Sequence, residues 1–209
     1  QNQDRMLHAA MARVTGGLSP ASLAAAYTDW AVHLAISPGK QQQLIEKSIR
    51  KLHRLLLYAF ESATAGRRCA PCIEPLPQDQ RFVHSDWQHW PFNLIYQSFL
   101  LTQQWWYNAT TEVRGVTPHH EQVVTFAARQ LLDMVSPSNF VLTNPELLGE
   151  TIRSGGGNLY EGAVNLWRDW ERVAAGGQTA GSGGYEAGRN VAVTPGKVVL
   201  RNHLIELIQ

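Results

Sequence analysis

The chain has 209 residues, of which 44% are hydrophobic, so it is long enough to bury a core of one domain or slightly more. Its 18 basic and 17 acidic side chains leave a net charge of +1, which excludes a general electrostatic attraction to nucleic acid. No apolar run approaches the roughly 20 residues that span a bilayer, and the first residues lack the pattern of a secretory signal. The sequence therefore predicts a soluble, cytoplasmic protein with no membrane span.

Most helix starts are marked by a capping residue followed by proline, because proline at the first helical position gives up an amide that has no partner there. This pair opens four predicted helices: Pro20 to about Ile36, Pro38 to about Ser62, Pro118 to about Val135, and Pro145 to Ile152. Apolar residues recur three and four apart within the second helix, and again from Leu159 to Val173. This spacing predicts one buried stripe on each of these two helices.

The segment 92–106 is apolar around its whole circumference. A helix of this kind is enclosed on several sides, or lies against a partner. We therefore expect it to be the most enclosed element of the chain.

Two stretches interrupt the helical pattern. Residues 63–80 contain three prolines and a glycine, which predicts an extended connection, and residues 176–184 contain five glycines, which predicts a flexible linker. After the linker, residues 197–200 and 203–208 are short and rich in Val, Ile and Leu, as suits a pair of strands. The chain stops directly after the second of these, as if at the entrance to a further domain.

These patterns predict a mainly α fold, in which a multi-helix domain is followed by a glycine-rich linker and a short β-hairpin-like segment. We divide the chain into five parts: a helical extension (1–63), a proline-rich connection (64–85), a helical core (86–175), the linker (176–188) and a strand-forming segment (189–209).

Motifs for metal, nucleotide and acyl-transfer chemistry are incomplete. Cys69 and Cys72 have the spacing of a zinc or redox pair, but a structural zinc needs two further ligands and no second pair exists. A phosphate loop ending at Lys197 would need glycine where Val191 stands, and no serine or cysteine has glycine two positions away on both sides. We predict no catalytic residue, metal or cofactor in this chain, with a small zinc-bearing module as an alternative.

A basic face is one candidate for partner contacts. In the first two-thirds of helix 38–62, five basic residues oppose the single acid Glu46. They are candidates for binding an anionic surface, and a solvated face on a core helix is the alternative. The residues that we single out are Lys47, Arg50, Lys51 and Arg54.

Aromatic residues are the second candidate. Trp105 and Trp106 are adjacent, so both cannot point inward from one stripe, and at least one is expected to reach a partner or a wrapping loop. Core packing is the alternative for the whole set. The interface candidates are Trp87, Trp90, Phe92, Phe99, Trp105 and Trp106.

Four blocks carry a resemblance to a known family. They are DWQHWPF running into YQSFLLT (86–102), SPSNFVLTNPE (136–146), GNL (157–159) and GRNVAVTPGKVV (188–199). In order and spacing they resemble the N-terminal region of polyhydroxyalkanoate synthases, the polymerases that make bacterial storage polyester. The resemblance covers roughly residues 74–209, and the opening helices look like the shorter extension found in one subset of that family.

The resemblance implies an acyltransferase that polymerises 3-hydroxyacyl-CoA with release of CoA. In this family the cysteine nucleophile lies in a C-terminal α/β-hydrolase domain, which is absent from this chain and into which we expect the strand-forming segment to lead. Cys69 and Cys72 lack the glycines that flank such a nucleophile.

The implied role of this portion is non-catalytic. It would support its own catalytic domain, help the synthase form a homodimer, and contact the granule surface or the granule-coat proteins, with no nucleic-acid partner. The alternative is a stand-alone helical adaptor that binds an anionic surface through its basic helix.

Overall fold

The computed structural model describes residues 2–15, 19–65, 69–176, 184–186 and 188–209. The chain divides into two compact units, Gln1–Ile152 and Arg153–Gln209. Most of the predicted glycine-rich linker lies outside the described residues, and the five-part division of the chain stays a prediction.

The first unit is built from helices. In chain order they are α1 (Asn2–Thr15), α2 (Pro20–Ala35), α3 (Pro38–Ala65), the 3-10 turn η2 (Ser85–Gln88), α4 (Phe92–Thr110), α5 (Pro118–Met134), the 3-10 turn η3 (Pro137–Asn139) and α6 (Pro145–Arg153). The second unit contains α7 (Gly157–Ala174) and the strands β1 (Val198–Arg201) and β2 (Glu206–Ile208).

The predicted helix starts are confirmed, and side-chain caps stabilise those of α2, α5 and α6. The Ser19 hydroxyl accepts a hydrogen bond from the Ser22 amide at 3.3 Å, and the Thr117 hydroxyl accepts one from the His120 amide at 3.4 Å. The Asn144 side-chain oxygen accepts from the amide of Leu147 at 3.2 Å at the start of α6. Each bond satisfies an amide that the first helical turn leaves free.

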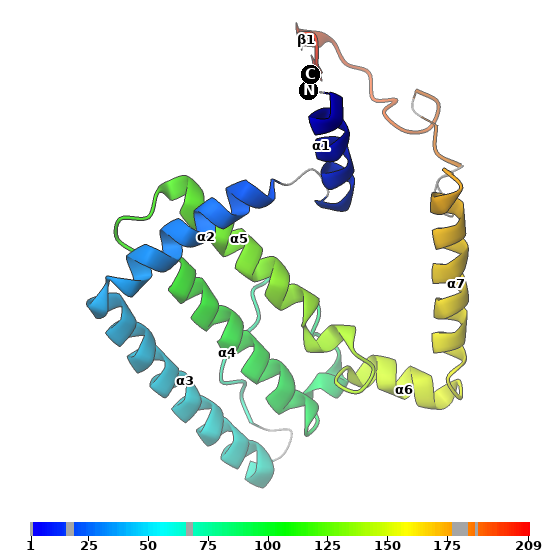
Figure 1. Cartoon of the computed structure of the whole chain (residues 1–209). Coiled ribbons are helices and arrows are strands. Elements are labelled where there is room, and N and C mark those ends of the chain that lie inside the picture. The colour runs from blue at the N-terminus through cyan, green and yellow to red at the C-terminus, as the bar shows by residue number, and fades with distance from the viewer. Residues whose placement is uncertain (1, 16–18, 66–68, 177–183, 187) are drawn as a thin grey trace. The chain divides into compact units, whose positions relative to one another are not determined.

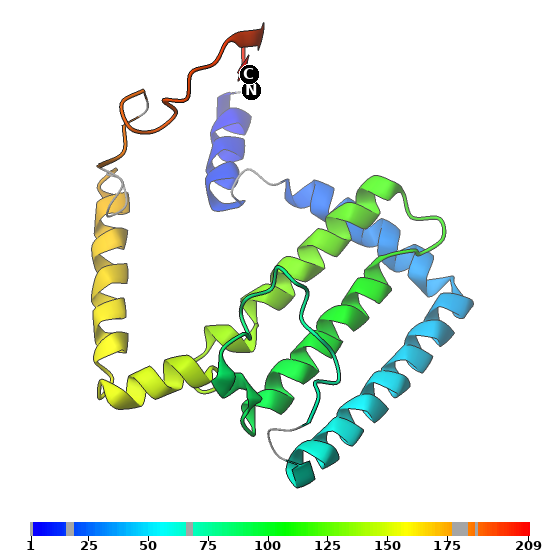
Figure 2. The same ribbon diagram turned by 180° about the vertical axis from the view of Figure 1, so that it is seen from behind.

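Helices α3, α4 and α5 lie side by side with α4 in the middle, and α2 crosses the end of this layer against α5 and α3 (Figures 1 and 2). Because α4 has a helix on either side, its apolar circumference is used on both flanks. Among the described elements of the unit, α4 contributes the largest number of buried residues, and it continues one turn beyond the predicted end to Thr110. The expectation of an enclosed helix is confirmed.

Two clusters form the core of the first unit. One joins Phe82, Trp87, Tyr96, Phe99 and Leu100 beneath the proline-rich connection. The other joins Ala26, Trp30, Val113 and Val124 where α2 meets α5, and the Trp30 indole donates a buried hydrogen bond to the carbonyl of Ala109 at 2.9 Å.

The proline-rich connection is fixed to α4 by a buried side-chain amide. The Gln97 side chain accepts a hydrogen bond from the Ile73 amide at 2.8 Å and donates one to the Ile73 carbonyl at 2.9 Å. Further along, the Arg81 guanidinium donates to Asp79 and to Asp133 of α5, both at 2.7 Å. The proline-rich connection thus forms hydrogen bonds with side chains of α4 and α5, where a strand would bond to a neighbouring strand.

The predicted buried stripes on α3 and α7 are wrong for the residues that the structure describes. Every large apolar residue of the two stripes is exposed, and α7 has no buried residue at all. The spacing correctly indicates amphipathic helices, but within each unit no described element lies over these faces. On α3 it is the neighbouring face, with Leu44 and Tyr58, that packs into the unit.

The second unit ends in the predicted pair of strands. β1 and β2 pair antiparallel, with Leu200 opposite Leu207 and Arg201 opposite Glu206. A Cβ atom on Gly196 would lie 2.3 Å from Ile208, so the approach to the hairpin requires glycine. The fold is therefore mainly α with a terminal β-hairpin, as the sequence predicts. In the part of the chain that the structure describes, no helix combines the length and the apolar character that crossing a membrane requires.

Candidate interaction surfaces

The structure separates the predicted aromatic interface residues. Trp87 is 0% exposed and Phe99 is 9% exposed, both within the first core cluster, and Phe92 packs against that cluster. Trp90, in contrast, is 71% exposed. Of these four residues, only Trp90 has most of its surface exposed.

Trp105 and Trp106 point to opposite flanks of α4. The Trp105 indole donates to the Leu44 carbonyl of α3 at 3.2 Å, whereas Trp106 packs against the second core cluster, toward α2 and α5. Both side chains are half-buried. Because α4 has neighbouring helices on two flanks, each of the adjacent tryptophans packs against a different part of the same unit.

The four basic residues lie along α3, and three of them bind neutral acceptors. Lys47 donates to the side-chain oxygen of Asn108, Lys51 to that of Gln104, and Arg54 to the carbonyl of Cys72. These bonds fix the side chains without neutralising their charge. Arg50 lies 3.8 Å from Glu46, in an exposed pair of the kind that contributes little to stability.

The positive charges of this basic face lie close enough together to change the pKa of one of its members. Partial burial lowers the pKa of Lys51, and the neighbouring positive charges of Arg54, Lys47 and Arg50 lower it further. The structure therefore brings the predicted basic set together as one positive patch.

A groove that the sequence analysis missed lies between α2 and α5. It encloses about 700 Å³, and its walls are almost entirely carbon. The side chains that rim it and remain largely exposed are Leu23, Tyr27, Leu131 and Val135. The only sequence signal is apolar spacing on two separate helices, and the groove appears once the crossing of α2 over α5 is known.

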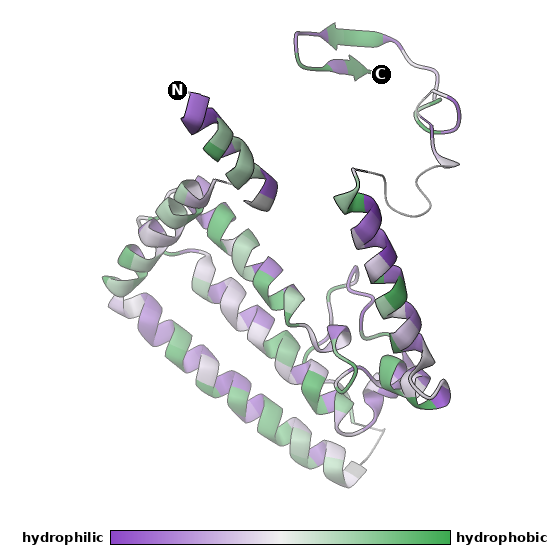
Figure 3. Cartoon of the chain, turned by 45° about the vertical axis from the view of Figure 1, so that its right-hand side comes forward, coloured by the Kyte–Doolittle hydropathy of each residue, from purple (hydrophilic) through white to green (hydrophobic). Residues whose placement is uncertain are grey.

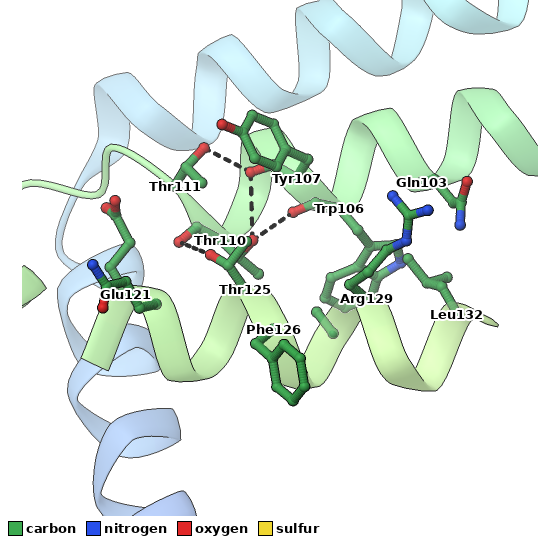
Figure 4. A pocket seen from close by; sticks show the side chains of 12 residues that line it. Gln103, Trp106, Tyr107, Thr110, Thr111, Glu121, Thr125, Phe126, Arg129 and Leu132 are labelled. Atoms are coloured by element: carbon green, nitrogen blue, oxygen red, sulfur yellow. Dashed lines mark hydrogen bonds between the residues drawn. The ribbon is translucent and has the colours of Figure 1, made fainter. Parts of the chain in front are cut away.

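A second pocket of about 500 Å³ lies between α4 and α5 (Figure 4). Its threonine hydroxyls are occupied: Thr110, Thr111 and Thr125 donate to backbone carbonyls at 3.0, 2.7 and 3.3 Å. Its Gln103 and Arg129 side chains both bind Asp133, each at 2.9 Å. The bonds from Thr125 and Gln103 join α4 to α5, and the others stay within one helix, so the polar groups of this pocket bind one another and the backbone.

The two cysteines are not activated as nucleophiles. Burial raises the pKa of the Cys69 thiol, as does its hydrogen bond to Glu61, and burial likewise raises the pKa of the Cys72 thiol. A nucleophilic cysteine needs the opposite shift, because the thiolate is the reactive form. Among the residues that the structure describes, no three His, Cys, Asp or Glu side chains gather as a metal site requires.

Asp29 joins α2 to the start of α5. Its carboxylate lies 2.6 Å from Nδ1 of His120 and 2.9 Å from Nδ1 of His33, and it accepts a hydrogen bond from the Thr117 amide at 3.3 Å. The hydrogen bond with His120, followed by that from Thr117, lowers the pKa of Asp29. In this position the cluster ties two helices together.

Comparison with known proteins identifies the family. A family model described as the poly-beta-hydroxybutyrate polymerase (PhaC) N-terminus matches residues 78–209, and one described as the poly-beta-hydroxybutyrate polymerase N terminal matches residues 1–40. No solved structure matches the chain.

Curated relatives agree with this assignment. A poly(3-hydroxyalkanoate) polymerase of Methylorubrum extorquens is 45% identical over 149 residues, which are 69% of this chain and 24% of the relative. Polymerase subunits PhaC of Rhizobium etli and Cupriavidus necator are each 36% identical, over 65% and 63% of this chain and 23% and 22% of their own length.

The chain thus spans about a quarter of the length of the relatives that it matches. The PhaC model alone covers more than half of the chain, and it includes the aromatic core, α4 to α7 and the hairpin. From this match we conclude that the chain belongs to the family of poly-beta-hydroxybutyrate polymerase N-terminal domains.

Proposed function

We propose that this chain is a non-catalytic domain of a poly(3-hydroxyalkanoate) polymerase, which acts at the surface of storage granules in the cytoplasm. It contacts the polyester or the granule-coat proteins, helps polymerase subunits associate and supports the catalytic part of the enzyme. The raised pKa values of both thiols support a non-catalytic role, since neither cysteine is prepared to carry an acyl group.

The groove between α2 and α5 carries this proposal. A polyester of short hydroxy acids presents alkyl groups and carbonyl acceptors and has no charge. The groove matches this chemistry, because its walls are almost entirely apolar and its rim residues Tyr27 and Leu131 are exposed. On this proposal the polyester is its occupant.

Sedimentation with protein-free poly(3-hydroxybutyrate) particles tests the proposal. We expect the double variant Tyr27→Glu and Leu131→Glu to bind the particles at least about tenfold more weakly, because it places two charges against an apolar surface. Leu142→Glu is the matched control, since Leu142 is exposed outside the groove. Unchanged binding by the double variant would refute the groove as the polyester site.

A parallel assay tests the non-catalytic part. The chain incubated with 3-hydroxybutyryl-CoA should release no CoA. Release that disappears in Cys69→Ala or Cys72→Ala would show instead that this chain carries a nucleophile.

The positive patch on α3, in which three of the four basic side chains bind only neutral acceptors, favours a second candidate, a helical adaptor for anionic surfaces. Replacing Lys47, Arg50, Lys51 and Arg54 together by Gln should then abolish binding to phosphatidylglycerol vesicles, and binding by the unaltered chain should weaken as salt rises. The same variant should keep its binding to uncharged polyester particles, so the two candidates give different results.

A further inference from the structure

Helix α3 carries two different apolar faces. The face with Leu44 and Tyr58 packs into the first unit, and Trp105 of α4 bonds to the Leu44 carbonyl. The other face, which we call the outer stripe, remains between 58% and 72% exposed at every large apolar position. Its members are Ile45, Ile49, Leu52, Leu56 and Phe60.

The position of α3 in the layer leaves the outer stripe open. The helix lies at one edge, beside α4 on one flank only, and apolar turns recur along its length (Figures 1 and 3). No described element of the first unit covers these side chains.

The spacing of the outer stripe is that of a helix that packs on another helix. From Ile45 to Leu56 the steps are four, three and four residues, which is the alternation of the two core positions of a heptad. At 100° per residue, the five side chains fall within roughly 80° of arc. A partner that fits is a second helix with the same spacing.

The basic residues of α3 argue against an anionic lipid surface as the partner of this stripe. Such a surface attracts a helix through Lys and Arg side chains that reach its headgroups. On α3 the mean direction of the four basic residues lies roughly 170° from that of the outer stripe, by the same helical geometry. They bond toward residues of α4 and the connection instead. An uncharged stripe lets two copies approach without opposing like charges.

The available area sets the strength of such a contact. Five large apolar side chains on each of two copies represent on the order of 1,000 Å² of apolar surface. This is close to the roughly 1,000 Å² that a specific interface needs, and below the roughly 1,600 Å² of a typical one. The contact should therefore be a weak and reversible one.

We propose that the outer stripe of α3 is a self-association face, on which α3 of a second copy packs as in a two-helix coiled coil. The inference deepens the proposed role in subunit association by naming its surface. It is tested without polyester, so its failure would leave the groove and its occupant untouched.

Leu52 offers the sharpest test because it lies at the middle of the stripe. It meets its own counterpart whether the two helices run parallel or antiparallel. Sedimentation equilibrium of the unaltered chain should show a concentration-dependent dimer. Leu52→Glu and Leu52→Lys should each raise the dissociation constant at least about tenfold, because each places like charges in contact across the two-fold axis.

Mixing the two variants separates lost contact from lost folding. An equimolar mixture of Leu52→Glu and Leu52→Lys should regain a dimer, since opposite charges now meet, and only folded chains can do so. Leu142→Glu, at an exposed leucine away from α3, should leave the dimer unchanged. A monomeric unaltered chain, a Leu52→Glu dimer of unaltered affinity, or a mixture that stays monomeric would each overturn the proposal.

Discussion

Single aromatic residues hold the connection and α4 together. Phe82 lies with its ring stacked on Tyr96 at 5.4 Å and edge-on to Trp87 at 4.9 Å. The Arg81 guanidinium lies 5.4 Å from the centre of the Phe99 ring, so a charged group on the connection contacts the same cluster. One ring of this group therefore contributes to packing on several sides.

Phe99→Ala should lower the free energy of unfolding by about 3 to 5 kcal/mol, through lost transfer energy and the cavity left behind. Urea unfolding followed by tryptophan fluorescence measures this loss. Phe126→Ala is the matched control, because Phe126 on α5 is 64% exposed and its loss should change stability by no more than about 0.5 kcal/mol. Equal effects of the two substitutions would show that Phe99 is not a core residue.

At the level of residues, sequence alone could not separate core from surface within the aromatic set. Trp87 and Trp90 stand three positions apart in one block, yet the first is buried and the second is exposed. The difference arises because the extended connection, with Phe82, folds over Trp87. That contact depends on the path of the chain between elements, and the spacing of residues within one block does not show this path.

At the level of elements, the turn between α4 and α5 depends on Gly115. Its φ is +99°, a conformation that other residues rarely adopt, and a Cβ atom there would lie 2.3 Å from the His33 ring of α2. Both the backbone and the packing therefore require glycine.

Gly115→Ala should destabilise the chain by roughly 1 to 3 kcal/mol or more, because it adds backbone strain to a steric clash. Gly149→Ala provides the opposite control. Gly149 lies within α6 with nothing near its missing Cβ, so alanine should stabilise that helix by up to about 1 kcal/mol. Thermal unfolding of both variants checks the two signs, and a neutral Gly115→Ala would contradict this view of the turn.

The elements themselves were largely predictable, for local reasons. A capping side chain and the proline after it act within one turn, so the starts of α2, α3, α5 and α6 follow from sequence. Periodicity shows that a helix has an apolar face, but it does not show what covers that face. For this reason the stripes on α3 and α7 were wrongly expected to be buried, and the groove between α2 and α5 was missed.

At the level of the whole molecule, carboxylates link elements that are distant in sequence. Asp29 of α2 forms a hydrogen bond with His120 of α5. Arg81 of the connection donates hydrogen bonds to its neighbour Asp79 and to Asp133 of α5. Hydrogen bonding to Arg81 lowers the pKa of Asp79 below its ordinary value of 3.8, and hydrogen bonding with His120 lowers the pKa of Asp29 in the same way.

A lowered carboxyl pKa in the folded state stabilises the protein fully above about pH 4, and this contribution is lost as the pH falls further. The free energy of unfolding should therefore decrease between about pH 4 and pH 2. Asp79→Asn should be less stable at pH 7 and depend less on pH in that acidic range. Asp169→Asn, which breaks an exposed pair with Arg172, should change stability at pH 7 by less than about 1 kcal/mol. An unchanged acid dependence in Asp79→Asn would contradict this assignment.

The two hydrogen bonds between Gln97 and Ile73 have a consequence for variation in chain length. The Gln97 side chain gives Ile73 one acceptor and one donor, as a neighbouring strand would. The connection is therefore fixed at its middle and consists of two short loops. Lengthening a loop costs little, about 0.6 kcal/mol for each doubling. Insertions on either side of Ile73 should therefore leave the helical layer intact, which makes these positions suitable for a fluorescent label or a peptide tag.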